Sequence, residues 1–193
     1  MGEKVVVQIT EPSSRGRRPR GAITESLGDS ADPAVQTVAV IREYGLRDEF
    51  PDEVLAVAAA LPDKVPPADL EGRLDLRDTL TITIDPEDAR DYDDAVTIKR
   101  IRDGYELGVH IADVAHYVPH DGVVDLEARL RGTSVYLPGQ TLPMLPEALS
   151  NNLCSLRQGR DRLTRTVLMR FSADGELKDA EIARSCICSR RRL

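Results

Sequence analysis

Residues 80–96 read Leu-Thr-Ile-Thr-Ile-Asp-Pro-Glu-Asp-Ala-Arg-Asp-Tyr-Asp-Asp-Ala-Val, and they are the most informative stretch of the chain. Apolar and polar side chains alternate over residues 80–84, which is typical of a half-buried strand. Six acids follow this strand, and Arg90 is the only base among them. The acids are Asp85, Glu87, Asp88, Asp91, Asp93 and Asp94. Because a second strand is predicted from residue 94, the acidic loop is held at both ends and its carboxylates cannot simply move apart.

The acidic loop has two interpretations. Runs of acids are common in solvated loops, and that interpretation needs no ligand. Carboxylates held within about 4 Å of one another, however, either raise each other's pKa or bind a cation. Hard oxygen ligands select Mg²⁺ or Mn²⁺ among the catalytic metals, and Mg²⁺ prefers few carboxylates together with water and substrate phosphate. The second interpretation therefore predicts a divalent metal site for phosphoryl chemistry.

Other acidic and catalytic motifs do not match the sequence. An EF-hand that starts at Asp91 requires Gly at its sixth position and Glu at its twelfth, where this chain has Val96 and Arg102. A phosphatase-type Asp-x-Asp at Asp91 requires an apolar strand before it, but residues 88–90 are Asp-Ala-Arg. Phosphate-binding P-loop, dinucleotide-binding and Gly-x-Ser-x-Gly motifs do not occur in the sequence.

Downstream of the loop the pattern predicts an α+β fold with an antiparallel component. The predicted strands are residues 94–101 and 105–113, which form one hairpin, and residues 163–171 and 177–187, which form another. Each pair is separated by an Asp-Gly turn signal. A short helix is predicted over residues 123–131.

Upstream of the loop, two strands are predicted over residues 4–10 and 21–27 because β-branched residues are frequent there. Two strands alone cannot bury a core, so residues 1–30 are interpreted as the closing strands of a barrel or a sheet. Residues 31–74 combine Ala-rich helical stretches with four prolines between residues 51 and 67, which indicates a helical connector. Residues 75–193 form the remaining domain.

Composition limits the class of protein. The chain has 26 Lys and Arg against 33 Asp and Glu, which gives a net charge of −7. Its hydrophobic residues make up 41% of the sequence, a fraction compatible with a globular protein. The longest apolar run is residues 54–61, far below the roughly 20 residues that cross a bilayer.

The three cysteines do not have the spacing of a zinc site. They are interpreted as reduced and structural residues of a cytoplasmic protein. Arginine clusters at residues 15–20 and 184–192 are either solvated or bind a polyanion.

Four ordered blocks resemble the catalytic RNB domain of the ribonuclease II and ribonuclease R family. The blocks are Asp75-Leu-Arg-Asp with residues 83–96, His110-Ile-Ala-Asp-Val-Ala-His-Tyr117, Arg131-Gly-Thr-Ser-Val-Tyr-Leu-Pro138 and residues 143–156. The resemblance implies that residues 1–30 belong to a cold-shock domain of the OB type. It also implies that residues 75–193 are the first part of a mixed α/β RNB domain.

The resemblance further implies a metal-dependent 3′→5′ exoribonuclease that hydrolyses single-stranded RNA to nucleoside 5′-monophosphates. By position, the family's metal-site aspartates fall on Asp85, Asp91, Asp93 and Asp94, with Asp93 and Asp94 as catalytic residues. The expected cofactor is Mg²⁺, with Mn²⁺ as a substitute. Tyr136 corresponds to the residue that stacks on an RNA base.

Other side chains and functions follow from the same comparison with the family. His110 and His116 are expected to be structural because the metal mechanism needs no imidazole. The expected partner is single-stranded RNA, with no membrane and no small-molecule cofactor, and the oligomeric state stays open. Because the arginine and glutamate that complete the family's active site lie downstream, the alternative is a catalytically incompetent fragment that binds RNA or metal.

Overall fold

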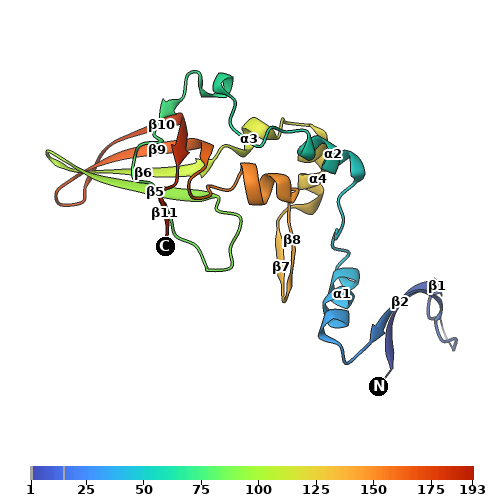
Figure 1. Ribbon diagram of the computed structural model, residues 1–193. Coiled ribbons are helices and arrows are strands. Elements are labelled where there is room, and N and C mark those ends of the chain that lie inside the picture. The colour runs from blue at the N-terminus through green and yellow to red at the C-terminus, as the bar shows by residue number, and fades with distance from the viewer. Residues whose placement is uncertain (1, 15) are drawn as a thin grey trace. The chain divides into compact units, whose positions relative to one another are not determined.

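The computed structural model describes residues 2–14 and 16–193 (Figure 1). The chain divides into two compact units. Unit 1 comprises Met1–Phe50 and Arg131–Met144, and unit 2 comprises Pro51–Leu130 and Leu145–Leu193. Among the described residues, no helix is both long enough and apolar enough to cross a membrane.

Unit 1 begins with an antiparallel hairpin of β1 (Glu3–Glu11) and β2 (Arg20–Asp29). These strands confirm the two predicted at the N-terminus. Helix α1 (Pro33–Glu43) follows the hairpin. It begins at Pro33 because the Asp32 side chain caps the first turn by accepting a hydrogen bond from the Ala34 N–H, and because the φ of proline is fixed near the helical value. The apolar side chains of Ile9 and Ile23 remain exposed on the hairpin, since two strands cannot cover both faces.

A second hairpin in unit 1 was not predicted from the sequence. It pairs β7 (Val135–Leu137) with β8 (Gln140–Leu142) through a Pro138-Gly139 turn. Gly139 has a φ of 76°, a conformation that favours glycine. Each strand has only three residues, too few for an alternating pattern to be recognised.

Unit 2 is built on a seven-stranded sheet with the order β11-β4-β5-β6-β9-β10-β3. Its strands are β3 (Leu74–Asp75), β4 (Ile82–Thr83), β5 (Asp94–Ile101), β6 (Gly104–Ala112), β9 (Asp161–Ser172), β10 (Leu177–Cys188) and β11 (Arg191–Arg192). The two predicted hairpins are confirmed as β5–β6 and β9–β10, which lie side by side in Figure 1. The turn into β6 requires glycine, because a Cβ on Gly104 would lie 1.9 Å from the Phe171 carbonyl oxygen.

The short strands make the sheet mixed. β3 pairs in parallel with β10, and β11 pairs in parallel with β4. Neither β3 nor β11 was predicted. The strand predicted over residues 80–84 is confirmed only at Ile82–Thr83, and the exposed side chains of Leu80 and Ile84 lie outside it.

Helical segments complete unit 2. They are α2 (Asp52–Ala59), the 3₁₀ turn η1 (Pro67–Leu70), α3 (Val114–Tyr117), α4 (Val123–Arg131), whose last residue belongs to unit 1, and the π-type turn η2 (Leu149–Leu153). The helix predicted over residues 123–131 is therefore confirmed. The largest fully buried apolar side chains of unit 2 come from the η2 region and the inner strands: Leu149, Leu156, Leu163 and Ile187.

The cysteines contribute to this buried region. Cys154 and Cys186 are buried and Cys188 is half-buried, and all three are free thiols. Burial raises the pKa of Cys154 to about 12 and the pKa of Cys186 to about 11. Both side chains are therefore neutral thiols that pack as small apolar groups, which agrees with the structural role predicted for them.

The centre of the sheet contains a buried polar network around His110. Its Nδ1 lies 2.8 Å from Thr166 Oγ1 and its Nε2 lies 3.1 Å from Thr97 Oγ1. Ser185 Oγ links Thr166 with Thr164. Both ring nitrogens thus have hydroxyl partners on neighbouring strands, and His110 is structural, as predicted.

Burial lowers the pKa of His110 to about 4, and we expect this shift to make stability depend on pH. In the unfolded chain the His110 imidazole binds a proton near pH 6.5. The contribution of neutral His110 to the unfolding free energy is therefore complete above that pH and is lost as the pH falls toward 4. The loss is about 3 kcal/mol of unfolding free energy. Urea unfolding at about pH 7 and about pH 4.5 measures it. His110→Gln should lose correspondingly less stability between the two pH values, and an equal loss in both proteins would contradict the prediction.

Candidate functional site

The acidic loop joins β4 to β5 at the edge of the sheet near β11 (Figure 1). Asp94 is the first residue of β5, and both Asp93 and Asp94 are exposed. Asp85 is half-buried, and its Oδ2 has no hydrogen-bond partner among the described residues. Burial is the largest cause that raises the pKa of Asp85, and the negative charges of Asp94 and Asp93 add to it. A hydrogen bond from Thr83 and the charge of Arg192 lower the pKa, but they do not outweigh the other causes. Three of the four predicted aspartates therefore lie close enough to interact.

The donor set fits a hard divalent cation. The Asp85 Oδ2 is buried, has no hydrogen-bond donor among the described residues and lies near two further carboxylates. A neighbouring cation would stabilise its negative charge. Within residues 2–14 and 16–193, no three His, Cys, Asp or Glu side chains converge in ligating positions. The structure thus brings Asp85, Asp93 and Asp94 into one region without assembling a complete ligand shell. Asp91, also on this loop, is half-buried.

The segment after η2 holds the middle of the loop. Ser155 Oγ donates to the Arg90 carbonyl at 2.7 Å and accepts from the Tyr92 N–H at 3.2 Å. The Leu156 N–H donates to the Tyr92 carbonyl at 2.7 Å. On the β5 side, the Ala112 N–H donates to the Asp93 carbonyl at 2.9 Å. The backbone of the acidic loop is therefore fixed at several points between Arg90 and Asp93.

The C-terminal segment holds the other side of the loop. The Leu193 N–H donates to the Thr83 carbonyl at 2.9 Å. The Arg192 guanidinium donates to the Pro86 carbonyl and lies 5.1 Å from the centre of the Tyr92 ring. Arg192 comes from one of the two arginine clusters noted in the sequence, so at least this member of the cluster contacts the acidic loop.

A polar hollow borders the loop within unit 2. It is lined by Arg90, Tyr92, Glu147, Asn151 and Arg157. Among the described residues, neither Arg90 nor Arg157 forms an ion pair with an acid. The hollow therefore has two arginines among its lining residues beside the acidic loop, and Glu147 opposes their charge. Sequence reasoning missed this hollow, because its walls come from segments about 60 residues apart.

Tyr136 lies on β7 in unit 1 and its side chain is 66% exposed. A residue that stacks on a base requires an accessible ring, and Tyr136 has one.

His116 lies on α3, and its Nε2 is 3.0 Å from the Asp69 carboxylate. This contact with Asp69 agrees with the structural role predicted for His116.

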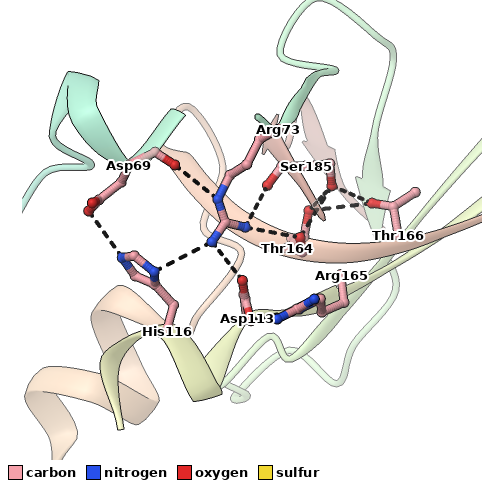
Figure 2. A network of polar contacts seen from close by, with 8 residues as sticks. All are labelled: Asp69, Arg73, Asp113, His116, Thr164, Arg165, Thr166 and Ser185. Atoms are coloured by element: carbon pink, nitrogen blue, oxygen red, sulfur yellow. Dashed lines mark hydrogen bonds and ion pairs between the residues drawn. The ribbon is translucent and has the colours of Figure 1, made fainter. Parts of the chain in front are cut away.

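A buried charged network lies at the end of β6, and sequence reasoning missed it. Figure 2 shows the Arg73 guanidinium pointing toward Asp113, 2.7 Å away, with both side chains 1% exposed. Arg165 contacts the other Asp113 oxygen at 3.0 Å. Although burial alone would raise the pKa of Asp113, hydrogen bonds and charge from the two arginines outweigh it and lower that pKa below its ordinary value. The network links the segment before β3 to the sheet.

Comparisons with known proteins agree with this geometry. The family model for the RNB domain matches residues 73–193, and the model for the cold shock domain matches residues 1–51. Ribonuclease R of Thermotoga maritima is 45% identical over 99% of this chain. The chain spans 27% of that relative's length.

Two solved structures also resemble the chain. Mycoplasma genitalium RNase R, in complex with ribose methylated single-stranded RNA, matches with a TM-score of 0.92 at 33% identity, over 99% of this chain and 30% of that chain. Yeast Ssd1, a pseudonuclease, matches with a TM-score of 0.77 at 22% identity, over 99% of this chain and 24% of its own, which shows the fold alone. The predicted α+β organisation, a cold-shock segment followed by RNB sequence, is confirmed. The chain therefore belongs to the RNB-domain family, among relatives named ribonuclease R.

Proposed function

We propose that this chain carries the metal-holding part of a 3′→5′ exoribonuclease that hydrolyses single-stranded RNA to nucleoside 5′-monophosphates. The observation that carries the proposal is the fixed acidic loop, where the buried Asp85 Oδ2 has no hydrogen-bond donor among the described residues and the carboxylate is repelled by Asp93 and Asp94. The name of the Thermotoga relative and the RNA in the Mycoplasma structure support RNA as the substrate.

Asp85, Asp91, Asp93 and Asp94 would hold Mg²⁺, or Mn²⁺ in its place. When bound, the ion supplies positive charge that favours attack of water on a phosphate. Asp93 and Asp94 are proposed as the catalytic residues because they are exposed at the start of β5, where a phosphate can approach. Arg90 and Arg157 in the bordering hollow supply positive charge that attracts the phosphate backbone.

The remaining assignments follow from the same function. The proposed partner is single-stranded RNA, without a membrane or a small-molecule cofactor. The free, largely buried thiols support a reducing compartment, and we place the protein in the cytoplasm. The proposed domain limits are residues 1–30 for the cold-shock strands, 31–74 for the connector and 75–193 for the RNB part.

Tyr136→Ala tests the RNA contact. We expect single-stranded RNA to bind this chain about 5- to 150-fold more weakly, because stacking on an aromatic ring contributes roughly 1–3 kcal/mol per base. Fluorescence anisotropy with a labelled oligoribonucleotide measures the change. Tyr136→Phe should retain binding because the ring is kept. Tyr44→Ala removes another exposed tyrosine of unit 1 and should have no effect. Equal losses for Tyr136→Ala and Tyr44→Ala would contradict the stacking role.

The function itself is tested in a hybrid enzyme. This chain replaces the matching 27% of Thermotoga maritima ribonuclease R, and the hybrid is incubated with RNA that has a 3′ overhang. We expect release of nucleoside 5′-monophosphates from the 3′ end that requires Mg²⁺ or Mn²⁺. A folded hybrid that binds RNA or metal but releases no mononucleotides, beside an active parent enzyme, would favour the alternative of a catalytically incompetent binding fragment.

A further inference from the structure

One buried hydroxyl group contacts both peptide bonds that flank Asp91. Ser155 Oγ donates to the Arg90 carbonyl at 2.7 Å, and this carbonyl belongs to the peptide bond before Asp91. The same Oγ accepts from the Tyr92 N–H at 3.2 Å, which belongs to the peptide bond after Asp91. Two fixed peptide planes determine the direction of the Cα–Cβ bond between them. Ser155 therefore sets the direction in which the Asp91 side chain leaves the backbone.

The position of Ser155 is itself rigid. Its side chain is fully buried, so water does not compete for the two hydrogen bonds. The Ser155 carbonyl accepts from Arg162 Nε at 2.9 Å, and Arg162 is only 2% exposed. Arg162 also donates to Asn152 Oδ1 at 2.8 Å, within η2. The hydroxyl thus projects from a well-supported turn onto the acidic loop.

A second bond from the same segment strengthens this link. The Leu156 N–H donates to the Tyr92 carbonyl at 2.7 Å, so consecutive residues 155 and 156 both hold Tyr92. The Tyr92 hydroxyl in turn donates to the Ala89 carbonyl at 2.8 Å. The link to Ser155 is therefore part of a connected set of bonds, and within that set the Ser155 hydroxyl contacts both peptide bonds that flank Asp91.

We propose that Ser155 is a positioning residue for divalent metal: it orients Asp91 toward the ion without contacting the ion. This inference rests on the proposed metal site at the acidic loop. Residues that orient metal ligands from outside the ligand shell typically change metal affinity 10- to 100-fold when they are removed. Ser155 is expected to act through the direction of Asp91 and to leave RNA contacts elsewhere unchanged.

Mn²⁺ binding to this chain tests the proposal without an activity assay. Electron paramagnetic resonance of free Mn²⁺ gives the dissociation constant for wild type, Asp93→Asn and Ser155→Ala. We expect Asp93→Asn to abolish the specific site and Ser155→Ala to weaken it about 10-fold or more. Equal binding by wild type and Asp93→Asn would overturn the metal site and the Ser155 role with it. Specific binding that Ser155→Ala leaves unchanged would overturn the Ser155 role alone.

Ser185→Ala is the matched control for burial. Ser185 is also fully buried and its hydroxyl also bonds two residues, Thr164 and Thr166, but among the described residues it forms no hydrogen bond with the acidic loop. Its removal is expected to lower the unfolding midpoint as Ser155→Ala does and to leave Mn²⁺ affinity unchanged. Equal loss of Mn²⁺ affinity in both variants would contradict a specific role.

A second variant covers the case in which Ser155→Ala does not fold. Ser155→Cys keeps nearly the same volume, and its thiol is a weak donor and acceptor. Under reducing conditions it is expected to fold and to bind Mn²⁺ more weakly than wild type. Wild-type Mn²⁺ affinity in folded Ser155→Cys would overturn the proposal.

Discussion

Asp93→Asn in the hybrid enzyme is expected to lower RNA hydrolysis at least about 10³-fold, equivalent to roughly 4 kcal/mol of transition-state stabilisation. Asparagine is nearly isosteric with aspartate, and the Asp93 carbonyl that accepts from the Ala112 N–H is retained, so the loop should keep its backbone. The change removes one anionic ligand where the charge of a divalent cation must be balanced. The measurement is the rate of mononucleotide release at saturating Mg²⁺.

RNA binding should survive this substitution. In the proposed function, binding depends on basic side chains and on stacking at Tyr136, and removal of a negative charge near the phosphate reduces repulsion. We therefore expect an inactive hybrid that retains single-stranded RNA with equal or higher affinity. Asp88→Asn makes the same chemical change on the same exposed loop, outside the four proposed ligands, and should keep most of the activity. Parallel losses of binding and hydrolysis in Asp93→Asn would indicate a structural role, and unchanged hydrolysis would remove Asp93 from the site.

Arg73→Leu is expected to lower the unfolding free energy of the chain by about 3–5 kcal/mol, because it leaves the buried Asp113 charge without its closest partner. Arg73 also donates to the backbone carbonyls of Asp69, Thr164 and Ser185, as Figure 2 shows. Leucine satisfies none of these carbonyls. The remaining partner, Arg165, has a side chain that is 54% exposed and compensates only in part. Urea unfolding at neutral pH measures the loss.

Arg77→Leu is the control for this second experiment. Arg77 forms ion pairs with Asp75 and Asp161, but all three side chains are substantially exposed. Exposed ion pairs contribute about 0–1 kcal/mol, so Arg77→Leu should cost far less than Arg73→Leu. Similar losses for the two variants would show that burial of the Arg73–Asp113 pair does not determine its contribution.

Local sequence patterns were sufficient for the larger elements. The two Asp-Gly turns and the runs of apolar residues beside them predicted the β5–β6 and β9–β10 hairpins, because strand pairing across a short turn involves residues that are close in sequence. The acidic loop could be identified for the same reason, since the four aspartates proposed as metal ligands lie within ten consecutive residues. The ordered motifs then indicated the RNB family, which the comparison over residues 73–193 shows.

The support of the candidate site could not be predicted in this way. Ser155 bonds Arg90 and Tyr92 from more than 60 residues away, and Arg73 bonds Ser185 across 112 residues. Strands β3 and β11 have two residues each, too few for any periodicity. The sequence around a hydroxyl group or a charged side chain has no periodic pattern from which its distant partner could be predicted. These contacts form only when the sheet brings the segments together, because burial then makes an unsatisfied polar group costly and selects the partners that can satisfy it.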